Sequence, residues 1–359
     1  MGNFNKKQII KKILINNNID AILLYAPENR FWYSDFISTL GYLLITQTQA
    51  NLLLDGRYIT EGKINAKNVI CHEFSNAFDC LDGLIKAQKI IKIGFEAEYI
   101  TYSQLEFWKK MLPTVIFVPI YVSTMRMIKD KIEISRIKKA CAIGDLAFNE
   151  VLKFIKPGVS EKDIEAVILR AFSKNGATKA SFDTIVASGV RGAMPHGKAS
   201  NKIIANNELV TCDFGCVYEQ YCSDMTRTFM IGQVDSKLTE IHEIVKSAQM
   251  AGIKAIKPGI AIGIIDKICR DYIKNKGYEK YFTHGTGHGL GIEIHEAPWV
   301  IKNETTILEP GMVITVEPGI YIANLGGVRI EDDILVTENG YEILTKSSRT
   351  INVLKEVVI

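Results

Sequence analysis

Three of the six histidines in the chain, His284, His288 and His295, lie within the stretch HGTGHGLGIEIHEAP (284–298). Two histidines four residues apart can bind zinc from one face of a helix that also carries a glutamate. Glycines at every second position of 285–291 would cost such a helix about 3 to 4 kcal/mol relative to alanine, so a strand or loop is expected instead. In a strand, His284 and His288 share a face, and His295 points away unless the chain bends. Three imidazoles so close together indicate a functional site rather than a glycine loop with incidental histidines.

Two aspartates lie in the segment ELVTCDFGCVYEQYCSDMTRTFM (208–230), which is typical of two strands around a polar turn. A two-residue loop at 218–219 would place Asp213 directly opposite Asp224, with their Cβ atoms about 4.5 to 5.5 Å apart. Like charges at this distance repel, so a cation between them is expected. Tyr-Glu is poor turn chemistry, however, and a bulge at Gly215 would shift this register.

Two glutamates repeat the arrangement in GMVITVEPGIYIANLGGVRIEDDILVTENG (311–340). Glu317 lies in one apolar run and Glu331 in the next, after a turn indicated by the asparagine and glycines of 324–327. Each half thus offers two carboxylates on adjacent strands, and His288 can supply a nitrogen. A single such acid is often a surface residue, but four acids beside a histidine cluster suit a pair of divalent ions such as manganese, cobalt or iron(II). A structural zinc site would prefer thiolates.

An internal repeat positions these acids in two similar halves. The tetrapeptide IKPG at 155–158 recurs at 256–259, an offset of 101, and a helical pattern follows each copy. Further matches are Gly176 with Gly277, and VTCDFG (210–215) with ITVEPG (314–319). A period of this length is too long for a solenoid and predicts two related halves that face each other across a pseudo-two-fold axis.

The 359 residues are too many for one ordinary domain, so two are expected. In residues 1–124, helical patterns alternate with apolar runs, which predicts a small α/β domain. These runs are residues 21–25, 42–46, 51–54 and 90–95. A long helical stretch then leads, near residue 125, into a second domain that comprises residues 125–359.

Composition excludes several classes of protein. An apolar content of 47% and a charged content of 23% are typical of a soluble globular protein. The net charge of +3 is spread out, so no nucleic-acid partner is expected, and no apolar run approaches the roughly 18 residues of a membrane span. Seven cysteines without a CxxC pair predict reduced thiols and a cytoplasmic location. Cys212 and Cys216 fall on the face opposite Asp213, which predicts that they fill a core rather than bind zinc.

The motifs together resemble those of the metallopeptidase family with the pita-bread fold, which contains Xaa-Pro aminopeptidases, prolidases and methionine aminopeptidases. The resemblance covers essentially the whole chain. The motifs that carry it are FDTIVASGVRGAMPHG, CDFG with SDMTRT, HGTGHGLGIEIHE, VEPGIY and GGVRIEDD. It implies the α/β (α+β) class, with a creatinase/prolidase-type N-terminal α/β domain (1–124) and a C-terminal pita-bread domain (125–359) that contains the pseudo-two-fold repeat.

The same resemblance implies a role for each candidate residue. The residues expected to hold two divalent metal ions per chain are Asp213, Asp224, His288, Glu317 and Glu331. Manganese is favoured, with cobalt, iron or zinc as alternatives. The residues expected to bind substrate and handle protons are His196, His284, His295, Glu317 and Arg329. For His295 to reach the cleft, the chain has to bend after His288. A water whose pKa the metals lower would then attack the first peptide bond, with Glu317 as the general base.

The resemblance further implies an exopeptidase that cleaves the N-terminal Xaa-Pro bond of short peptides, an Xaa-Pro aminopeptidase. It also implies a homodimer. The nearest alternative is an Xaa-Pro dipeptidase restricted to dipeptides. A creatinase-like amidinohydrolase works without metals, and a non-catalytic peptide-binding module would be expected to have lost ligands. The complete set of acids and histidines therefore favours a hydrolase over both.

Overall fold

The computed structural model describes residues 6–349 and divides into two compact units between Arg126 and Met127. Both units mix strands and helices, which confirms the predicted α/β class. Residues 1–5 and 350–359, at the outer ends of the two predicted domains, lie outside the described range. Within 6–349, no helix combines the length and the apolar character that crossing a membrane requires.

The first unit is built on one six-stranded mixed sheet. Its strands are β1 (Ala21–Leu24), β2 (Tyr42–Thr46), β3 (Ala50–Leu54), β4 (Ile70–Glu73), β5 (Lys92–Glu96) and β6 (Ile116–Ile120). Its helices are α1 (Lys6–Asn16), α2 (Pro27–Ser34), α3 (Ile59–Asn65), α4 (Ala77–Ala87), α5 (Tyr102–Met111) and the 3₁₀ turn η1 (Ser123–Arg126). The strand order is β4-β3-β2-β1-β5-β6, and β1 pairs antiparallel with β2 and parallel with β5.

The centre of this sheet follows the apolar pattern of the sequence. The four predicted apolar runs are confirmed as β1, β2, β3 and β5. Leu23 on β1 packs in the core with Leu44 of β2 and Trp108 of α5. The prediction omits the two edge strands, because β4 carries polar residues and β6 contains Pro119, both of which edge strands tolerate.

The second unit contains two helix pairs and a set of small antiparallel sheets. The helices are α6 (Lys131–Phe154), α7 (Glu161–Lys174), α8 (Ser236–Lys254), α9 (Gly263–Asn275) and the 3₁₀ turns η2 (Gly189–Ala193) and η3 (Glu279–Tyr281). The strands of its first half are β7 (Lys179–Ala180), β8 (Ile185–Ser188), β9 (Glu208–Phe214), β10 (Cys216–Tyr218), β11 (Tyr221–Cys222) and β12 (Met225–Ile231). Those of its second half are β13 (Gly287–Gly289), β14 (Glu296–Val300), β15 (Val313–Val316), β16 (Gly319–Ile322), β17 (Gly326–Arg329), β18 (Asp332–Thr337) and β19 (Gly340–Ile343).

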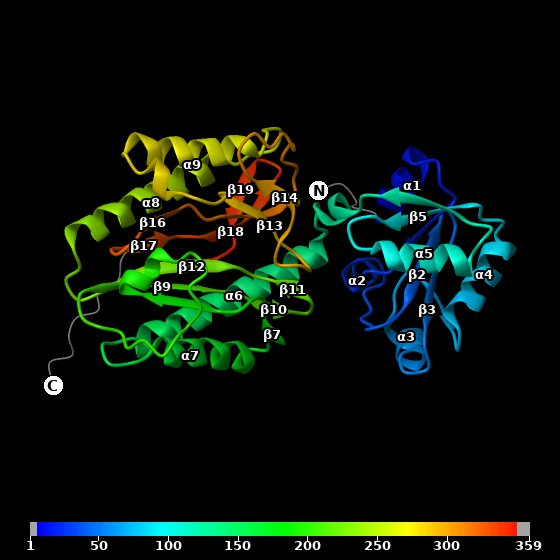
Figure 1. The fold of residues 1–359 in the computed structure, drawn as a ribbon, viewed down its shortest axis with the longest axis horizontal. Helices are drawn as coiled ribbons and strands as arrows, with labels where there is room; N and C mark the ends of the chain where they lie inside the picture. The colour runs from blue at the N-terminus through cyan, green and yellow to red at the C-terminus, as the bar shows by residue number, and fades with distance from the viewer. Residues whose placement is uncertain (1–5, 350–359) are drawn as a thin grey trace. The chain divides into compact units, whose positions relative to one another are not determined.

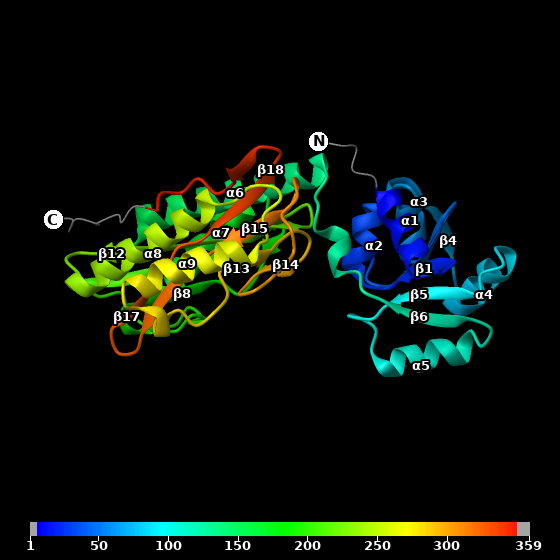
Figure 2. The same cartoon turned by 90° about the horizontal axis from the view of Figure 1, so that it is seen from above.

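The strands of this unit lie between the two helix pairs, as Figure 1 shows, and in the view from above α9 lies in the foreground (Figure 2). One core joins α6 and α7 to the sheet β12-β9-β8, and it contains Cys212 and Cys216, as predicted. A second core joins α8 and α9 to the strands of the second half, with Ile314 and Ile334 in its centre.

The predicted internal repeat is confirmed by the backbone. In each half, a long helix ends at the IKPG tetrapeptide and a second helix ends before a glycine. Gly158 and Gly259 have φ of +92° and +88°, and Gly176 and Gly277 have φ of +90° and +84°. Side chains other than glycine rarely adopt this conformation, so the matched glycines mark matched turns.

The structure corrects the predicted register of the first hairpin. The turn is formed by Glu219 and Gln220, with φ of +45° and +70°, instead of residues 218–219. Asp213 therefore lies opposite Thr226, and Asp224 lies two residues before Thr226 on the same strand side of the hairpin. The two aspartates still share a face of the sheet, because this shift moves the pairing by two residues. Gly215 introduces no register shift, since the same pairing continues on both sides of it.

A buried histidine joins α8 to the first half. His242 is fully buried, and its Nε2 donates a hydrogen bond to the carbonyl of Thr228 at 2.9 Å. Burial lowers the pKa of His242 to about 4, although the Thr228 carbonyl and Glu243 oppose this shift. The folded protein therefore holds this imidazole neutral at a pH at which the unfolded chain protonates it.

We predict that His242 makes the protein less stable in mild acid. Its stabilising contribution is complete above the unfolded pKa of about 6.5 and is lost as the pH falls toward 4, by about 3 kcal/mol. Chemical denaturation of the wild type and of His242→Gln, which keeps a donor to Thr228, measures this difference. The free energy of unfolding of the wild type should fall more steeply than that of the variant between pH 7 and pH 4. Parallel curves for the two proteins would contradict the prediction.

Candidate active site and metal centre

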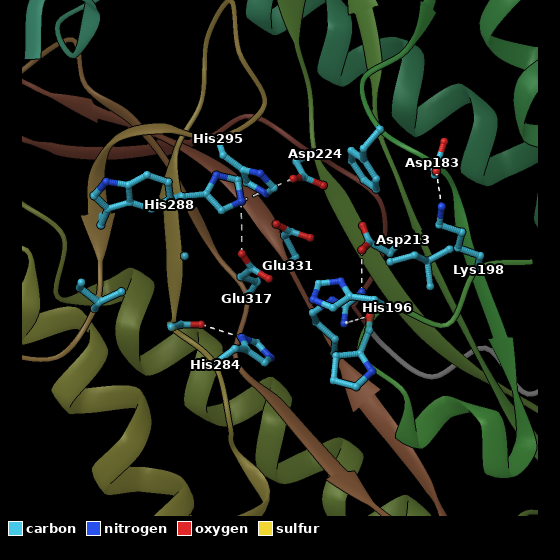
Figure 3. Close-up of a pocket in the computed structure, with 18 residues that line it drawn as sticks. Asp183, His196, Lys198, Asp213, Asp224, His284, His288, His295, Glu317 and Glu331 are labelled. Atoms are coloured by element: carbon cyan, nitrogen blue, oxygen red, sulfur yellow. Dashed lines mark hydrogen bonds and ion pairs between the residues drawn. The ribbon is translucent and has the colours of Figure 1, made fainter. Parts of the chain in front are cut away.

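All nine residues singled out in the sequence line one cavity of about 580 Å³ in the second unit. Figure 3 shows the four acids pointing toward one another, with His288 and His295 on one side and His196 on the other. They come from elements far apart in the chain: Asp213 from β9, His288 from β13, and Glu317 from the residue after β15. The fold thus brings both acidic pairs and the histidine cluster to one place.

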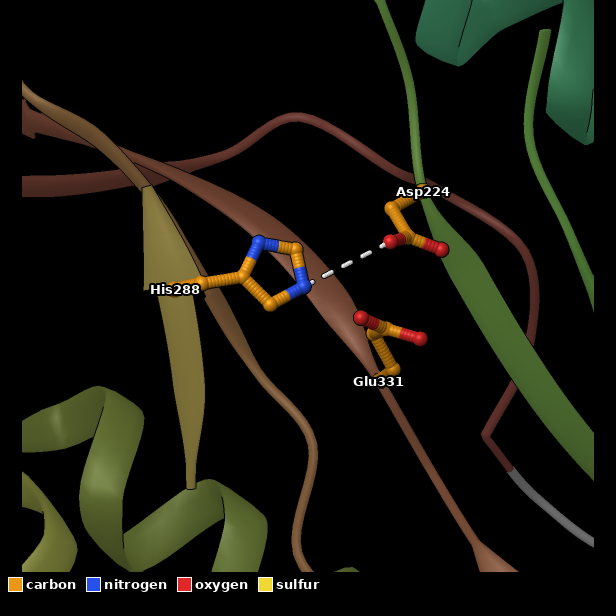
Figure 4. A group of neighbouring side chains, drawn as sticks. All are labelled: Asp224, His288 and Glu331. Carbon is orange, nitrogen blue, oxygen red and sulfur yellow. Dashed lines mark ion pairs between the residues drawn. The ribbon is translucent and has the colours of Figure 1, made fainter. Parts of the chain in front are cut away.

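The tightest group in this cavity consists of Asp224, His288 and Glu331, whose possible ligand atoms all lie within 4.8 Å of one another (Figure 4). His288 Nε2 lies 3.7 Å from Asp224 Oδ2 and 3.4 Å from Glu317 Oε1. Asp224 immediately precedes β12, and Glu331 lies between β17 and β18. Each half of the repeat therefore contributes acids to the same group.

The remaining aspartate is held by an arginine from the other half. Arg329 Nη2 donates to Asp213 Oδ2 at 2.6 Å, and both side chains are buried. Arg329 also donates through Nη1 to Tyr321 Oη at 2.9 Å and to the Pro195 carbonyl at 3.1 Å. Its Nε donates to Thr226 Oγ1 at 3.1 Å. These bonds use four of the five guanidinium N–H groups and hold Arg329 against Asp213.

Burial and mutual repulsion shape the electrostatics of the acids. Burial, followed by the charges of Glu331 and Asp213, raises the pKa of Asp224 well above its ordinary value. Burial and the charges of Glu317 and Asp213 do the same to the pKa of Glu331. Burial would also raise the pKa of Glu317, but the hydrogen bond and charge of His288 outweigh it and lower that pKa to about 2. Burial also raises the pKa of Asp213, although the charge of Arg329 opposes this shift. Negative charge is therefore costly at three of these acids as the protein stands.

The donor set fits divalent cations. One oxygen of each of three buried acids has no hydrogen-bond partner among the described residues: Asp213 Oδ1, Asp224 Oδ1 and Glu331 Oε1. Buried carboxylate oxygens without a donor are expensive unless a cation neutralises them. Carboxylates with one imidazole are the ligands of borderline and hard divalent ions, and the thiols of Cys212 and Cys216 belong to a hydrophobic core instead.

The alternating glycines have a steric reason. A Cβ at Gly287 would lie 2.2 Å from the carbonyl oxygen of Thr315, and one at Gly289 would lie 2.4 Å from that of Ala297. Strand β13 is thus held closely between β14 and β15, where only glycine fits on either side of His288. The predicted strand or loop is confirmed, and a helix is excluded.

The prediction from a regular strand, that His295 points away from His288, is wrong. The bend that the family resemblance requires is present. The chain turns back between β13 and β14, which pair antiparallel, and their register shifts after His288. The rings of His288 and His295 meet edge to face, with their centroids 4.4 Å apart. Burial, followed by the charge of His288, lowers the pKa of His295. This keeps a neutral imidazole beside the acids.

The other two histidines have different settings. His284 Nδ1 donates to the Gly285 carbonyl at 2.7 Å, so its Nε2 accepts from Tyr321 Oη at 2.8 Å. Burial lowers the pKa of His284, in keeping with this neutral tautomer. His196 is exposed on the opposite wall, beside the Pro195 carbonyl that Arg329 holds.

The sequence reasoning missed several residues that hold the site. Tyr321 links His284 to Arg329, and its position, four residues after Glu317 in a strand-like run, could have revealed a shared face. Asp333 accepts the Asp224 backbone N–H at 2.9 Å. Asp266 of α9 accepts from the Thr286 hydroxyl at 2.8 Å, and no local signal pointed to it.

Comparisons with known proteins agree with this geometry. Residues 135–338 match the metallopeptidase family M24, and residues 8–128 match the creatinase/prolidase N-terminal domain. An Xaa-Pro dipeptidase of Pyrococcus furiosus is 40% identical over 344 residues, which is 95% of this chain and 97% of the relative. The structure of an Xaa-Pro dipeptidase from Bacillus anthracis is 43% identical, with a TM-score of 0.94 over 97% of this chain and 99% of that one.

An X-Pro aminopeptidase from Thermotoga maritima is 36% identical in sequence, with a TM-score of 0.89 over 96% of this chain and 100% of that one. The predicted pita-bread architecture with a smaller N-terminal domain is therefore confirmed. Since the family match spans more than half of the chain and these relatives cover nearly all of it, the protein belongs to metallopeptidase family M24.

Proposed function

We propose that this protein is an exopeptidase that uses two divalent metal ions to hydrolyse the N-terminal Xaa-Pro bond of short peptides. The observation that carries the proposal is the convergence of two acidic pairs, one from each half, on His288 inside a cavity lined by three more histidines. The printed names of the relatives, Xaa-Pro dipeptidase and X-Pro aminopeptidase, support the choice of bond.

The five residues proposed to hold the metals are Asp213, Asp224, His288, Glu317 and Glu331. Manganese is favoured, and cobalt, iron and zinc are alternatives that carboxylates and imidazole can also bind. Two such ions would supply a water of lowered pKa and polarise the scissile carbonyl. They would also neutralise Asp213, Asp224 and Glu331, whose pKa values are otherwise raised by burial and nearby negative charge.

The side chains of the cavity divide the remaining work in this proposal. Glu317 Oε1 lies 3.4 Å from His288 Nε2, and Glu317 is the general base that takes the proton of the attacking water and passes it to the proline nitrogen. His295 and His196 donate hydrogen bonds to the substrate carbonyl as negative charge develops there. His284, held by Tyr321, lines the space for the residue after the cut. Arg329 fixes Asp213 from behind.

The far wall of the cavity favours the aminopeptidase over the dipeptidase. A strict dipeptidase has to bind the free carboxylate of proline, which calls for an available cation. Among the described lining residues, Arg329 is buried and paired with Asp213, and Lys198 is exposed and paired with Asp183. Trp299 and Ile301 line the cavity with 45% and 42% of their surface exposed. This apolar wall suits a continuing peptide chain better than a carboxylate.

The remaining proposals concern the setting of the enzyme. The resemblance to proline-directed members supports a cytoplasmic homodimer whose N-terminal domain, residues 1–124, helps restrict substrate length. The Xaa-Pro bond itself is a tertiary amide without an N–H, which general peptidases that bind that group handle poorly.

Glu317→Gln should abolish turnover, with a loss in kcat on the order of 10² to 10⁴, because the variant keeps the shape of the side chain but not its basicity. Hydrolysis of a Xaa-Pro-Yaa peptide by purified variant and wild type measures the loss. Glu309→Gln, at an exposed glutamate on the approach to the same strand, is the matched control and should keep full activity. Near-normal hydrolysis by Glu317→Gln would refute the assignment of the base.

Removal of metal should abolish activity, and manganese, cobalt or zinc added in turn should restore it to different degrees. Elemental analysis of the manganese-loaded protein should find two ions per chain. At a free ion concentration of 100 times Kd, the free energy of unfolding should rise by about 2.7 kcal/mol for each independent site. Asp224→Asn should lose most of this rise, whereas Asp183→Asn, at the mouth of the same cavity, should keep it. Full activity of the stripped protein would end the proposal.

The two substrate classes are separated by paired peptides. We expect kcat/KM for Xaa-Pro-Yaa to exceed that for the matching Xaa-Pro dipeptide, since the cavity wall offers apolar contact and no uncommitted buried cation. Amidation of the dipeptide carboxylate should leave its hydrolysis unchanged or improve it. A strong preference for the free dipeptide would establish the dipeptidase instead.

A further inference from the structure

A single buried carboxylate ties together the two ends of the loop that carries His196. Glu161, in the first turn of α7, is completely buried. Its Oε1 accepts from the Ser188 backbone N–H and hydroxyl, both at 2.8 Å. Its Oε2 accepts from the Ser200 backbone N–H at 3.0 Å and the Ser200 hydroxyl at 2.6 Å. The residues on either side of the loop 189–199 are therefore hydrogen-bonded to the same side chain.

An arginine within the loop completes this arrangement. Arg191 Nε lies 3.1 Å from Glu161 Oε2, and Arg191 Nη2 donates to the Lys198 carbonyl at 2.7 Å. The guanidinium thus spans the loop from its first turn to the residue that follows His196 and Gly197. Hydrogen bonds to a buried ionised group are among the stronger ones in proteins, so the base of the loop is closed firmly.

The loop fixed in this way forms one wall of the candidate active site. Pro195, His196 and Lys198 all line the cavity, and Figure 3 shows His196 facing the acids from this wall. A Cβ at Gly192 would lie 3.1 Å from the Gly327 backbone nitrogen, so the loop also packs closely on β17 of the second half. His196 has no hydrogen bond within the described residues that would hold its ring. Its position depends on the backbone that Glu161 anchors.

The second half of the repeat contains a counterpart. Asp266 of α9 is also completely buried, and its Oδ1 accepts from the Thr286 backbone N–H and hydroxyl at 3.2 and 2.8 Å. Its Oδ2 pairs with Arg270, which donates to the carbonyls of Phe282 and His284. In both halves, a buried acid on the second helix, assisted by an arginine, holds the segment that carries a cavity histidine.

We infer that Glu161 is a positioning residue for the active site: it closes the loop 189–199 and thereby places His196 against the reacting carbonyl. The catalytic consequence rests on the proposed function, but the closure of the loop does not. Glu161 touches neither the cavity nor the proposed metal ligands, so its loss should change the loop and the action of His196 while metal binding continues.

The first test follows the loop directly by limited digestion with trypsin, with the cleavage sites identified by mass spectrometry. In Glu161→Gln, one acceptor oxygen becomes an amide that faces donors, and cleavage after Arg191 or Lys198 should accelerate by on the order of tenfold. Asp163→Asn is the control, because Asp163 lies two residues along the same helix and caps it without touching the loop. An unchanged rate of cleavage in Glu161→Gln would overturn the inference.

The second test asks whether Glu161 acts through His196. Glu161→Gln should lower kcat/KM for a Xaa-Pro-Yaa peptide by on the order of tenfold at unchanged metal content, and the loss should largely vanish in a His196→Ala background. Losses that multiply would instead assign Glu161 a general structural role and overturn the inference. If Glu161→Gln does not fold, Ser200→Ala removes one donor and should show the same pattern more weakly. If the wild type hydrolyses no such peptide, the proposed function fails. The rate of cleavage by trypsin then still tests whether Glu161 closes the loop.

Discussion

The crowding of buried carboxylates where the two halves meet is the constraint on which the rest of the site depends. Asp213, Asp224, Glu317 and Glu331 share one cavity, in which Arg329 pairs with Asp213 and His288 faces Glu317. Three of the acids keep an oxygen that finds no donor among residues 6–349. A protein interior tolerates such a group only with further positive charge, which is why a metallopeptidase can hold its ions there.

Two arginines bind the halves together around these acids, and each crosses to the other half. Arg329, from β17, pairs with Asp213 of β9, whereas Arg227, from β12, pairs with Asp332 of β18 at 2.7 Å. Removing one partner of such a buried pair typically costs about 3 to 5 kcal/mol, because the other charge is left unpaired. Separation of the halves would break both ion pairs and would therefore incur this cost twice. The geometry of the acids is therefore coupled to the stability of the whole second unit.

The histidines show how the same fold adjusts chemically similar groups for different tasks. Contact with Glu317 makes His288 more basic despite its burial, whereas burial and a fixed tautomer keep His284 neutral. The neighbouring segments are held from outside the cavity, by Asp266 in one half and Glu161 in the other. The four acids that line the cavity are thus surrounded by further buried acids, which hold the backbone of the neighbouring segments.

Local patterns in the sequence were sufficient for the elements and for the composition of the site. The apolar runs predicted the central strands β1, β2, β3 and β5, and the repeated IKPG tetrapeptide predicted two halves, because both depend on short-range periodicity and glycine conformation. The alternating glycines excluded a helix around His288 for the same reason. The motifs identified the family and nominated nine residues, all of which the fold places in one cavity.

Only the tertiary structure decided the register of the first hairpin, the direction of the chain after His288 and the contacts that hold the loop around His196. The first hairpin turns at Glu219 and Gln220, which both have positive φ angles. Turns of this kind favour asparagine, aspartate and glycine, so the residue types did not predict the position of this turn. The bend after His288 depends on its pairing with β14, and the anchoring by Glu161 depends on residues 27 to 39 positions away. Contacts between distant segments leave no periodic trace in a single chain, so the sequence determined which groups could do the chemistry, and packing between the halves determined how they are held.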